Sequence, residues 1–253
     1  MKKSFGQHFL KDKTIAKKIV AALDLSPNDF LIEVGPGAGI LTEQVLLKYP
    51  ELQMVLIEAD KDLIADLRQK FSNIKIINKD AAKINYDELT VGKQWKFLSN
   101  LPYNAGNAIL RQVYSGTNKP TKAVVMVQKE VADKILATPK TGNGGVLTVA
   151  TQIYTNPKKI LTVKPGSFVP PPAVMSTVIS LDLHIKTENP EAVIDLAKVG
   201  FSARRKQLKN NLSAYFLDKN KDIKQVFEKA KIDFNARPQD LSIDDWVRLQ
   251  NLL

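Results

Sequence analysis

The residues Asn100-Leu101-Pro102-Tyr103 follow a short apolar run and are suited to chemistry on an aromatic amine. The exocyclic amine of adenine is a poor nucleophile because its lone pair is delocalised into the ring. Two acceptors outside the ring plane favour the localised form, and the Asn100 side-chain oxygen and the Leu101 carbonyl are such acceptors. Pro102 fixes the following φ, and Tyr103 can stack on a base, which is worth about 1 to 3 kcal/mol. The segment predicts a site that holds and activates an adenine amine.

An Asn-Leu-Pro turn that only closes a strand is the alternative interpretation of this segment. A second aromatic, Phe168, begins a proline-rich run that ends at Val174. Successive prolines make a stiff, extended loop, so Phe168 is a candidate for the other face of the adenine. A core aromatic beneath a loop is the alternative for Phe168.

A glycine-rich turn, residues 33–39, follows the first predicted strand, and its glycines let the backbone approach a ligand. A dinucleotide fingerprint would need a third glycine at position 40 or 42, where Ile40 and Thr42 stand. That third glycine brings a helix N-terminus close to a pyrophosphate, and S-adenosylmethionine has none. Gly35 and Gly37 are therefore predicted to border S-adenosylmethionine, and a purely structural turn is the alternative.

Two acidic residues end the next two predicted strands. Glu58 stands about 20 residues beyond the glycine turn, where a carboxylate can accept both ribose hydroxyls of an adenosine. Asp60 competes for this role, but it precedes an apolar helical pattern and is better explained as an N-cap. Asp80 and Ala81 can offer a carboxylate and a backbone N–H to the adenine, with a solvated turn as the alternative. Three such positions on successive strands predict a cofactor crevice at the carboxyl edge of a sheet.

The elements that must position these residues alternate in type along the chain. A helix over residues 14–23 precedes alternating strands and helices, and each strand is a short apolar run suited to burial on both faces. This pattern predicts an α/β fold with a doubly wound parallel sheet. Together with the predicted cofactor crevice, it fits a Rossmann-like class I S-adenosylmethionine-dependent methyltransferase sheet. The strands are expected at residues 30–34, 54–57, 74–77, 96–99, 123–127, 160–163 and 178–183.

A helical pattern begins at Asn189-Pro190, a cap followed by proline at the first helical position. We predict a methyltransferase domain over residues 1–186 and a small all-α C-terminal domain over residues 187–253. Its expected helices cover residues 191–199, 204–216, 223–230 and 244–252, the last capped by Ser242.

Composition narrows the classes of function. The net charge of +11 favours a polyanionic partner, and nucleic acid leads an anionic membrane. The absence of cysteine excludes disulfides and thiolate sites, and two distant histidines supply too few ligands for zinc, so no metal is expected. Because no apolar run reaches 18 residues, we expect no membrane span and a cytoplasmic protein.

Basic residues cluster near the N-terminus and again in residues 201–209, which hold four basic residues and no acid. We expect Arg204, Arg205, Lys206 and Lys209 to contact RNA phosphates from a helix. A solvated helical face is the alternative for such a run.

Several separated motifs, in order along nearly the whole chain, resemble the ribosomal RNA adenine dimethyltransferases of the small-subunit type. The resemblance implies that His8 and Leu10 help to hold the methionine end of S-adenosylmethionine, with Gly35, Glu58, Asp80 and Asn100 completing the site. It also implies dimethylation of two adjacent adenosines in the 3′-terminal hairpin loop of small-subunit (16S) rRNA, leaving S-adenosylhomocysteine. The motifs occupy residues 5–10, 33–39, 100–104, 127–131, 168–176 and 201–211.

The resemblance implies action on an assembling small ribosomal subunit, with the C-terminal domain contacting rRNA and the subunit, and we expect a monomer. One rival is the related large-subunit rRNA adenine methyltransferase of macrolide resistance. Residues 6–8 and 128–130 favour the small-subunit type. A second rival is a non-catalytic RNA-binding factor built on this fold, which an intact Asn100 and Glu58 disfavour.

Overall fold

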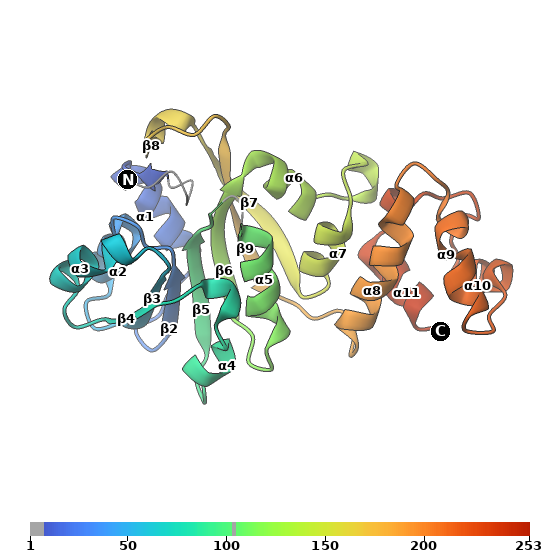
Figure 1. Ribbon diagram of the computed structural model, residues 1–253, viewed down its shortest axis with the longest axis horizontal. Coiled ribbons are helices and arrows are strands. Elements are labelled where there is room, and N and C mark those ends of the chain that lie inside the picture. Colours follow the sequence, from blue (N-terminus) through green and yellow to red (C-terminus); the bar gives the residue numbers. More distant parts are fainter. Residues whose placement is uncertain (1–7, 103–104) are drawn as a thin grey trace. The chain divides into compact units, whose positions relative to one another are not determined.

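The computed structural model describes residues 8–102 and 105–253. The chain forms two compact units (Figure 1), of which the first holds the residues up to Ala132 together with Pro157–Leu183. The second unit holds Asp133–Asn156 and His184–Leu253. The predicted boundary at 186/187 divides the chain into two continuous stretches. In the structure, residues 133–156 also belong to the second unit, because helix α7 (Val146–Gln152) packs against α8 (Pro190–Gly200).

A seven-stranded sheet forms the centre of the first unit. Its first five strands in the spatial order are parallel, and β9 is antiparallel to β6, which corrects the expectation of a wholly parallel sheet. Each predicted strand is present, and the observed bounds are wider in most cases. The spatial order is β4 (Lys75–Asn78), β3 (Gln53–Glu58), β2 (Phe30–Val34), β5 (Trp95–Asn100), β6 (Lys122–Gln128), β9 (Ser176–Leu183) and β7 (Thr155–Val163).

Helices cover both faces of this sheet. All residues of β2 are buried, as expected for a central strand between two helical layers. Figure 1 shows α1 to α3 on one side and α5 on the other. Asp12 begins α1 by accepting the backbone N–H groups of Thr14 and Ile15. The helices of the first unit are α1 (Lys13–Ala22), α2 (Ile40–Lys48), α3 (Lys61–Lys70), the short α4 (Tyr86–Leu89) and α5 (Gly106–Ser115). Helix α6 (Lys129–Ile135) begins in the first unit, and its last residues belong to the second.

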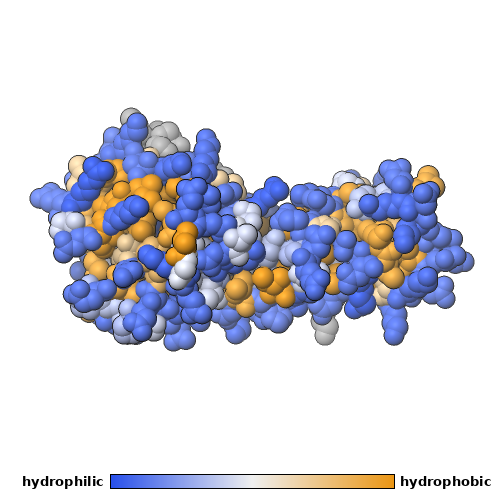
Figure 2. Space-filling view, turned by 90° about the horizontal axis from the view of Figure 1, so that it is seen from below, coloured by the Kyte–Doolittle hydropathy of each residue, from blue (hydrophilic) through white to orange (hydrophobic). Residues whose placement is uncertain are grey.

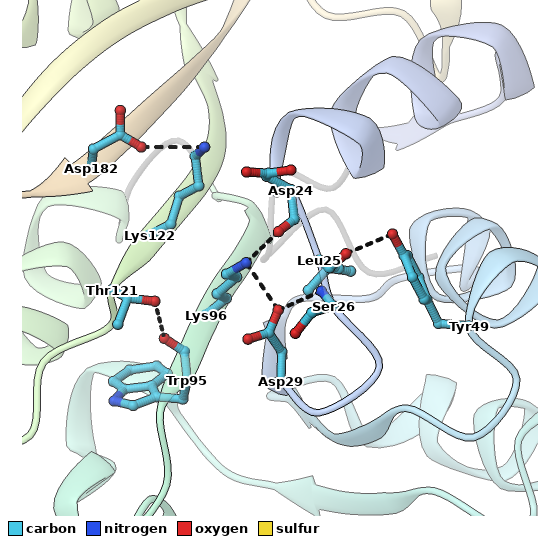
Figure 3. Close-up of polar contacts among 10 residues, drawn as sticks. All are labelled: Asp24, Leu25, Ser26, Asp29, Tyr49, Trp95, Lys96, Thr121, Lys122 and Asp182. Atoms are coloured by element: carbon cyan, nitrogen blue, oxygen red, sulfur yellow. Dashed lines mark hydrogen bonds and ion pairs between the residues drawn. The ribbon is translucent and has the colours of Figure 1, made fainter.

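Polar contacts fix the loop between α1 and β2 (Figure 3). The Nζ of Lys96 on β5 lies 2.9 Å from the Oδ2 of Asp29 and also donates to the Asp24 carbonyl. The hydroxyl of Tyr49 donates to the Leu25 carbonyl at 2.7 Å. These contacts attach the entry of β2 to β5 on one side and to the end of α2 on the other.

A short two-stranded sheet connects the N-terminal segment of the first unit with a segment about 160 residues later in the chain. Strand β1 (Phe9–Leu10) pairs antiparallel with β8 (Phe168–Val169), with Leu10 opposite Phe168. Both of these residues are buried in the hydrophobic cluster that contains α1 and α2. The sequence had not predicted this pair of strands.

The second unit is helical, as expected. Besides α7 and α8 it contains α9 (Leu208–Leu217), α10 (Ile223–Lys229) and α11 (Ile243–Gln250). The predicted caps Asn189 and Ser242 are confirmed. The helix expected from residue 204 instead begins at Leu208, because Asn211 donates to the carbonyls of Gly200 and Ala203 and holds a turn there.

The side of the protein that Figure 2 presents has apolar residues among hydrophilic ones. At the amino ends of the strands, the first unit has a hollow that Phe30, Met54 and Phe71 line together with Lys70 and Lys75. None of the helices in the described part of the chain is long and apolar enough to cross a membrane.

Candidate functional site

A pocket of the first unit opens where the strand order reverses. Strand β2 has β3 on one side and β5 on the other, and the loops after these strands diverge. Ligands of open α/β sheets bind in this crevice, beyond the carboxyl ends of the strands. The pocket has a volume of about 340 Å³. It is lined by segments that follow β2, β3, β4 and β5, and by β1.

The structure brings all predicted cofactor residues to this pocket. It is lined by the predicted residues His8, Leu10, Gly35, Gly37, Glu58, Asp80, Ala81, Asn100, Leu101 and Pro102. Tyr103 and Phe168 are the other predicted residues of the site. Tyr103 lies outside the described residues, and Phe168 is only 1% exposed and packs in the hydrophobic core. The observed position of Phe168 corrects the expectation of an open ring face, because β8 turns this side chain toward Leu10.

The glycine turn depends on residues without a side chain. Gly37 has a φ of +57°, a region that other residues rarely adopt. A Cβ atom at Gly37 would lie 2.8 Å from the Phe9 ring, and one at Gly39 would lie 2.6 Å from Phe71. The absent side chains therefore let β1 and α3 close against the turn.

Glu58, at the end of β3, is held by backbone donors. Its Oε2 accepts the N–H of Gly37 at 3.3 Å and its Oε1 accepts that of Asp60 at 2.9 Å. The residue is 5% exposed, and burial raises the pKa of its carboxyl although these N–H groups oppose the rise. Asp60 caps α3 by accepting the N–H of Asp62, which confirms the cap assignment. The Glu58 carboxylate is thus fixed at the pocket wall.

Glu33 is a second buried carboxyl group, one strand away. Its Oε2 accepts the Thr42 hydroxyl at 2.7 Å, and Oε1 has no hydrogen-bond partner among the residues that the structure describes. Burial raises the pKa of Glu33 to about 7 against the effect of Thr42, and the charge of Glu58 adds to the rise. The sequence analysis had included Glu33 only as part of the glycine motif.

Asp80 and Ala81 form the wall after β4. The Asp80 side chain accepts the N–H of Ala82 at 3.0 Å and so begins a short turn of 3-10 helix. The buried hydroxyl of Tyr86 donates to the Ala81 carbonyl at 3.0 Å. This contact holds the turn against the core and keeps Ala81 at the pocket.

Asn100 joins the end of β5 to the N-terminal segment. Its side-chain nitrogen donates to the His8 carbonyl at 3.2 Å, so Oδ1 is the acceptor end of the amide. The N–H of Leu101 donates to the Met126 carbonyl at 3.0 Å and continues the pairing of β5 with β6. The Nδ1 of His8 lies 2.8 Å from the Pro170 carbonyl oxygen. Three distant parts of the sequence thus meet at Asn100.

Sequence reasoning missed several apolar residues of the pocket and one lysine. Phe9 lies between two predicted residues, His8 and Leu10. An expected strand at this motif would have indicated that Phe9 also lies at the pocket. Lys79 precedes Asp80, but the chain has so many lysines that its sequence position alone did not single it out. The missed residues that line the pocket include Phe9, Ile57, Ala59, Lys79 and Ile109.

The four basic residues of the second unit have different surroundings. Arg204 donates from Nη2 to the Gly144 carbonyl at 2.9 Å, and the Nζ of Lys209 lies 3.1 Å from Asn235 Oδ1 and 4.1 Å from the centre of the Phe234 ring. Both side chains therefore make contacts within the unit. Arg205 and Lys206 are exposed in the turn before α9.

The strand order, the glycine turn and the acidic strand ends define a Rossmann-like class I methyltransferase that uses S-adenosylmethionine. The family model of the ribosomal RNA adenine dimethylases matches residues 1–253. The chain belongs to this family.

Curated relatives match almost the whole chain. The "Ribosomal RNA small subunit methyltransferase A" of Dehalococcoides mccartyi is 39% identical, over 98% of this chain and 87% of its own length. The protein of the same name from Prochlorococcus marinus is 36% identical, over 98% of this chain and 94% of its own. Two solved structures, each 22% identical, share the fold over 96% of this chain. They are a dimethyladenosine transferase from Plasmodium falciparum (TM-score 0.78, 96% of that chain covered) and the 23S rRNA methyltransferase ErmE (TM-score 0.75, 98% covered).

Proposed function

We propose that this protein transfers methyl groups from S-adenosylmethionine to the N6 amines of two adjacent adenosines in the 3′-terminal hairpin loop of small-subunit (16S) rRNA. The names of the curated relatives support the small subunit as the target. The observation that carries the proposal is the meeting of the Asn100 amide, the Glu58 carboxylate and the glycine turn in one pocket.

The residues of the pocket fit S-adenosylmethionine. Glu58 is a buried carboxylate that accepts the N–H groups of Gly37 and Asp60, and a carboxylate has about four lone-pair sites, so acceptor capacity remains for ribose hydroxyls. Asp80 and Ala81 line the part of the pocket that would hold the adenine of S-adenosylmethionine. His8, Leu10 and Gly35 line the part that would hold its methionine end. When bound, the cofactor supplies a methyl group on a positively charged sulfur.

Asn100 and Leu101 would orient the target amine. Because the Asn100 nitrogen is engaged by the His8 carbonyl, Oδ1 accepts one N–H of the amine, and the Leu101 carbonyl accepts the other. Pro102 keeps this carbonyl aimed, and Tyr103 stacks on the extruded base. No strong base is required, since the methylated amine is acidic enough to lose its proton to water. The pocket thus acts mainly by position and electrostatics.

The second unit would contact the rRNA and the subunit through its basic turn. Arg205 and Lys206 are the candidates for phosphate contacts, because Arg204 and Lys209 are engaged within the unit. We further propose a monomer that acts in the cytoplasm, where ribosomal subunits are assembled.

The test is incubation with small subunits that lack this modification and with labelled S-adenosylmethionine, followed by mass spectrometry of the nucleosides. The wild-type protein should form N6,N6-dimethyladenosine in the hairpin loop. Asn100→Ala should lose at least about 100-fold of this activity, as expected for removing a donor or acceptor that stabilises a transition state. Subunit binding by this variant should be unchanged. The absence of N6,N6-dimethyladenosine from the hairpin loop, or wild-type rates in the variant, would contradict the proposal.

A further inference from the structure

The loop over residues 169–175, named the apolar tip here, exposes apolar side chains at the surface of the first unit. Val169, Val174 and Met175 are 48%, 45% and 42% exposed. Pro170, Pro171 and Ala173 are exposed as well, and Pro172 is buried. Scattered single apolar residues are ordinary at a surface, whereas a contiguous group marks an interaction site.

The apolar tip is attached to the wall of the cofactor pocket. Val169 is paired with Phe9, and the His8 ring lies 2.8 Å from the Pro170 carbonyl, while both His8 and Phe9 line the pocket. At its other end, the Met175 carbonyl accepts the N–H of Lys129, the residue after β6, at 2.9 Å. The tip is therefore a supported structure beside the opening in which the target adenine must bind.

The charge around the tip matches a polyanion. No residue between Asp133 and Asp182 is acidic, and the stretch includes the exposed Lys164. Lys11 is also exposed and lies close by, because its N–H donates to the Ser167 carbonyl at 2.9 Å. The Ser167 N–H in turn donates to the Lys164 carbonyl at 3.0 Å. Two exposed lysines thus have their backbone next to Ser167, at the start of the apolar tip.

We propose that the apolar tip packs against the unstacked bases next to the target adenosine, while Lys11 and Lys164 contact the adjoining phosphates. This inference rests on the proposed function. A base drawn out of an RNA loop leaves neighbours with open faces, and apolar side chains that fill such gaps stabilise the distorted RNA. A protein partner is disfavoured, since lysine is depleted in protein interfaces, whereas phosphates favour lysine.

Photocrosslinking tests the position of the tip. Met175 is replaced by the photoreactive amino acid p-benzoylphenylalanine, and the protein is irradiated on small subunits that lack the modification. Crosslinks should map to rRNA nucleotides of the hairpin loop. The matched control places the same probe at Val91, which is 76% exposed and does not line the pocket. Crosslinks to a ribosomal protein, to a second copy or to no RNA would overturn the inference. The result does not require turnover, so it remains informative if methylation fails.

A kinetic experiment tests the contribution of the tip. The double variant Val174→Ser with Met175→Ser should lower kcat/KM for subunits by about tenfold, mainly through KM, because apolar side-chain surface that the bases would bury is removed. The affinity for S-adenosylmethionine should stay within about twofold of wild type, which excludes misfolding. Val91→Ser should behave as wild type. Equal kcat/KM in the double variant and the wild type would refute the proposed contact of the apolar tip with the bases. It would leave the methyltransferase assignment intact.

Discussion

At the residue scale, the site contains two buried carboxyl groups with different surroundings. Glu58 borders the pocket and accepts two backbone N–H groups, whereas Glu33 accepts one hydroxyl and has a raised pKa of about 7. Burial favours the neutral form of both groups. Near neutral pH the folded protein therefore takes up a proton that the unfolded chain does not hold.

This difference predicts that stability falls as pH rises. The unfolded Glu33 ionises near 4.5 and the folded one near 7, so between these values only the folded state holds the proton. The free energy of unfolding should decrease by about 3 kcal/mol across this window and level off above it. Glu33→Gln should lack this part of the decrease, because it keeps a neutral group opposite Thr42. Urea unfolding at pH 5 and pH 8 measures the change in the free energy of unfolding. Glu51→Gln is the control, because Glu51 is exposed. An equally pH-dependent Glu33→Gln variant would refute the interpretation.

At the element scale, the glycine turn is held between β1 and the end of β3. Gly37 donates to Glu58 and lies against the Phe9 ring, so one residue connects the cofactor carboxylate with the N-terminal strand. A side chain at this position disturbs both contacts.

Gly37→Ala should therefore be more damaging than its backbone conformation alone requires. Gly92 provides a matched control, since its φ of +66° is similar but no atom lies within 4 Å of an added Cβ. Gly92→Ala should cost about 1 to 2 kcal/mol of stability, and Gly37→Ala more, because Phe9 must also move. Gly37→Ala should in addition weaken cofactor binding. Calorimetric unfolding and titration with S-adenosylhomocysteine measure both effects, and equal losses in the two variants would exclude a role for Phe9.

Sequence patterns predicted the strands and the pocket acids well, because buried parallel strands are continuous apolar runs and their ends carry the ligands. The pairing of β1 with β8 was not predictable in this way. Two-residue strands have no period, and Phe9 and Val169 lie far apart in sequence. The burial of Phe168 follows from that pairing, so its position was missed too. Likewise, a run of arginine and lysine gives no information on which side chain, such as Arg204, bonds to its own fold.

At the scale of the whole molecule, the net charge of +11 must act through exposed cations. Arg204, Arg205 and Lys206 of the second unit are all exposed, but Arg204 donates to the Gly144 carbonyl and so supports the glycine-rich turn. Charge reduction at different basic residues should therefore have different effects.

Arg205→Ala with Lys206→Ala should weaken subunit binding most at low salt. Loss of two phosphate contacts should reduce the slope of log K against log salt by about 1 to 2, with cofactor affinity unchanged. The control pair Lys221→Ala with Lys224→Ala removes the same charge from exposed positions of the same unit and should change the slope less. Binding of labelled protein to small subunits over a salt series measures the slopes. Identical slopes for both double variants would mean that net charge alone matters.

The pairing of β1 with β8 also sets an order for biosynthesis. Leu10 and His8 leave the ribosome early, but their partners Phe168 and Pro170 are made only after about two-thirds of the chain. Until then the glycine turn and the acidic strand ends have no N-terminal wall, and Leu10 lacks its apolar neighbour. A nascent chain thus completes its cofactor pocket late, after the parallel strands of the sheet have been translated.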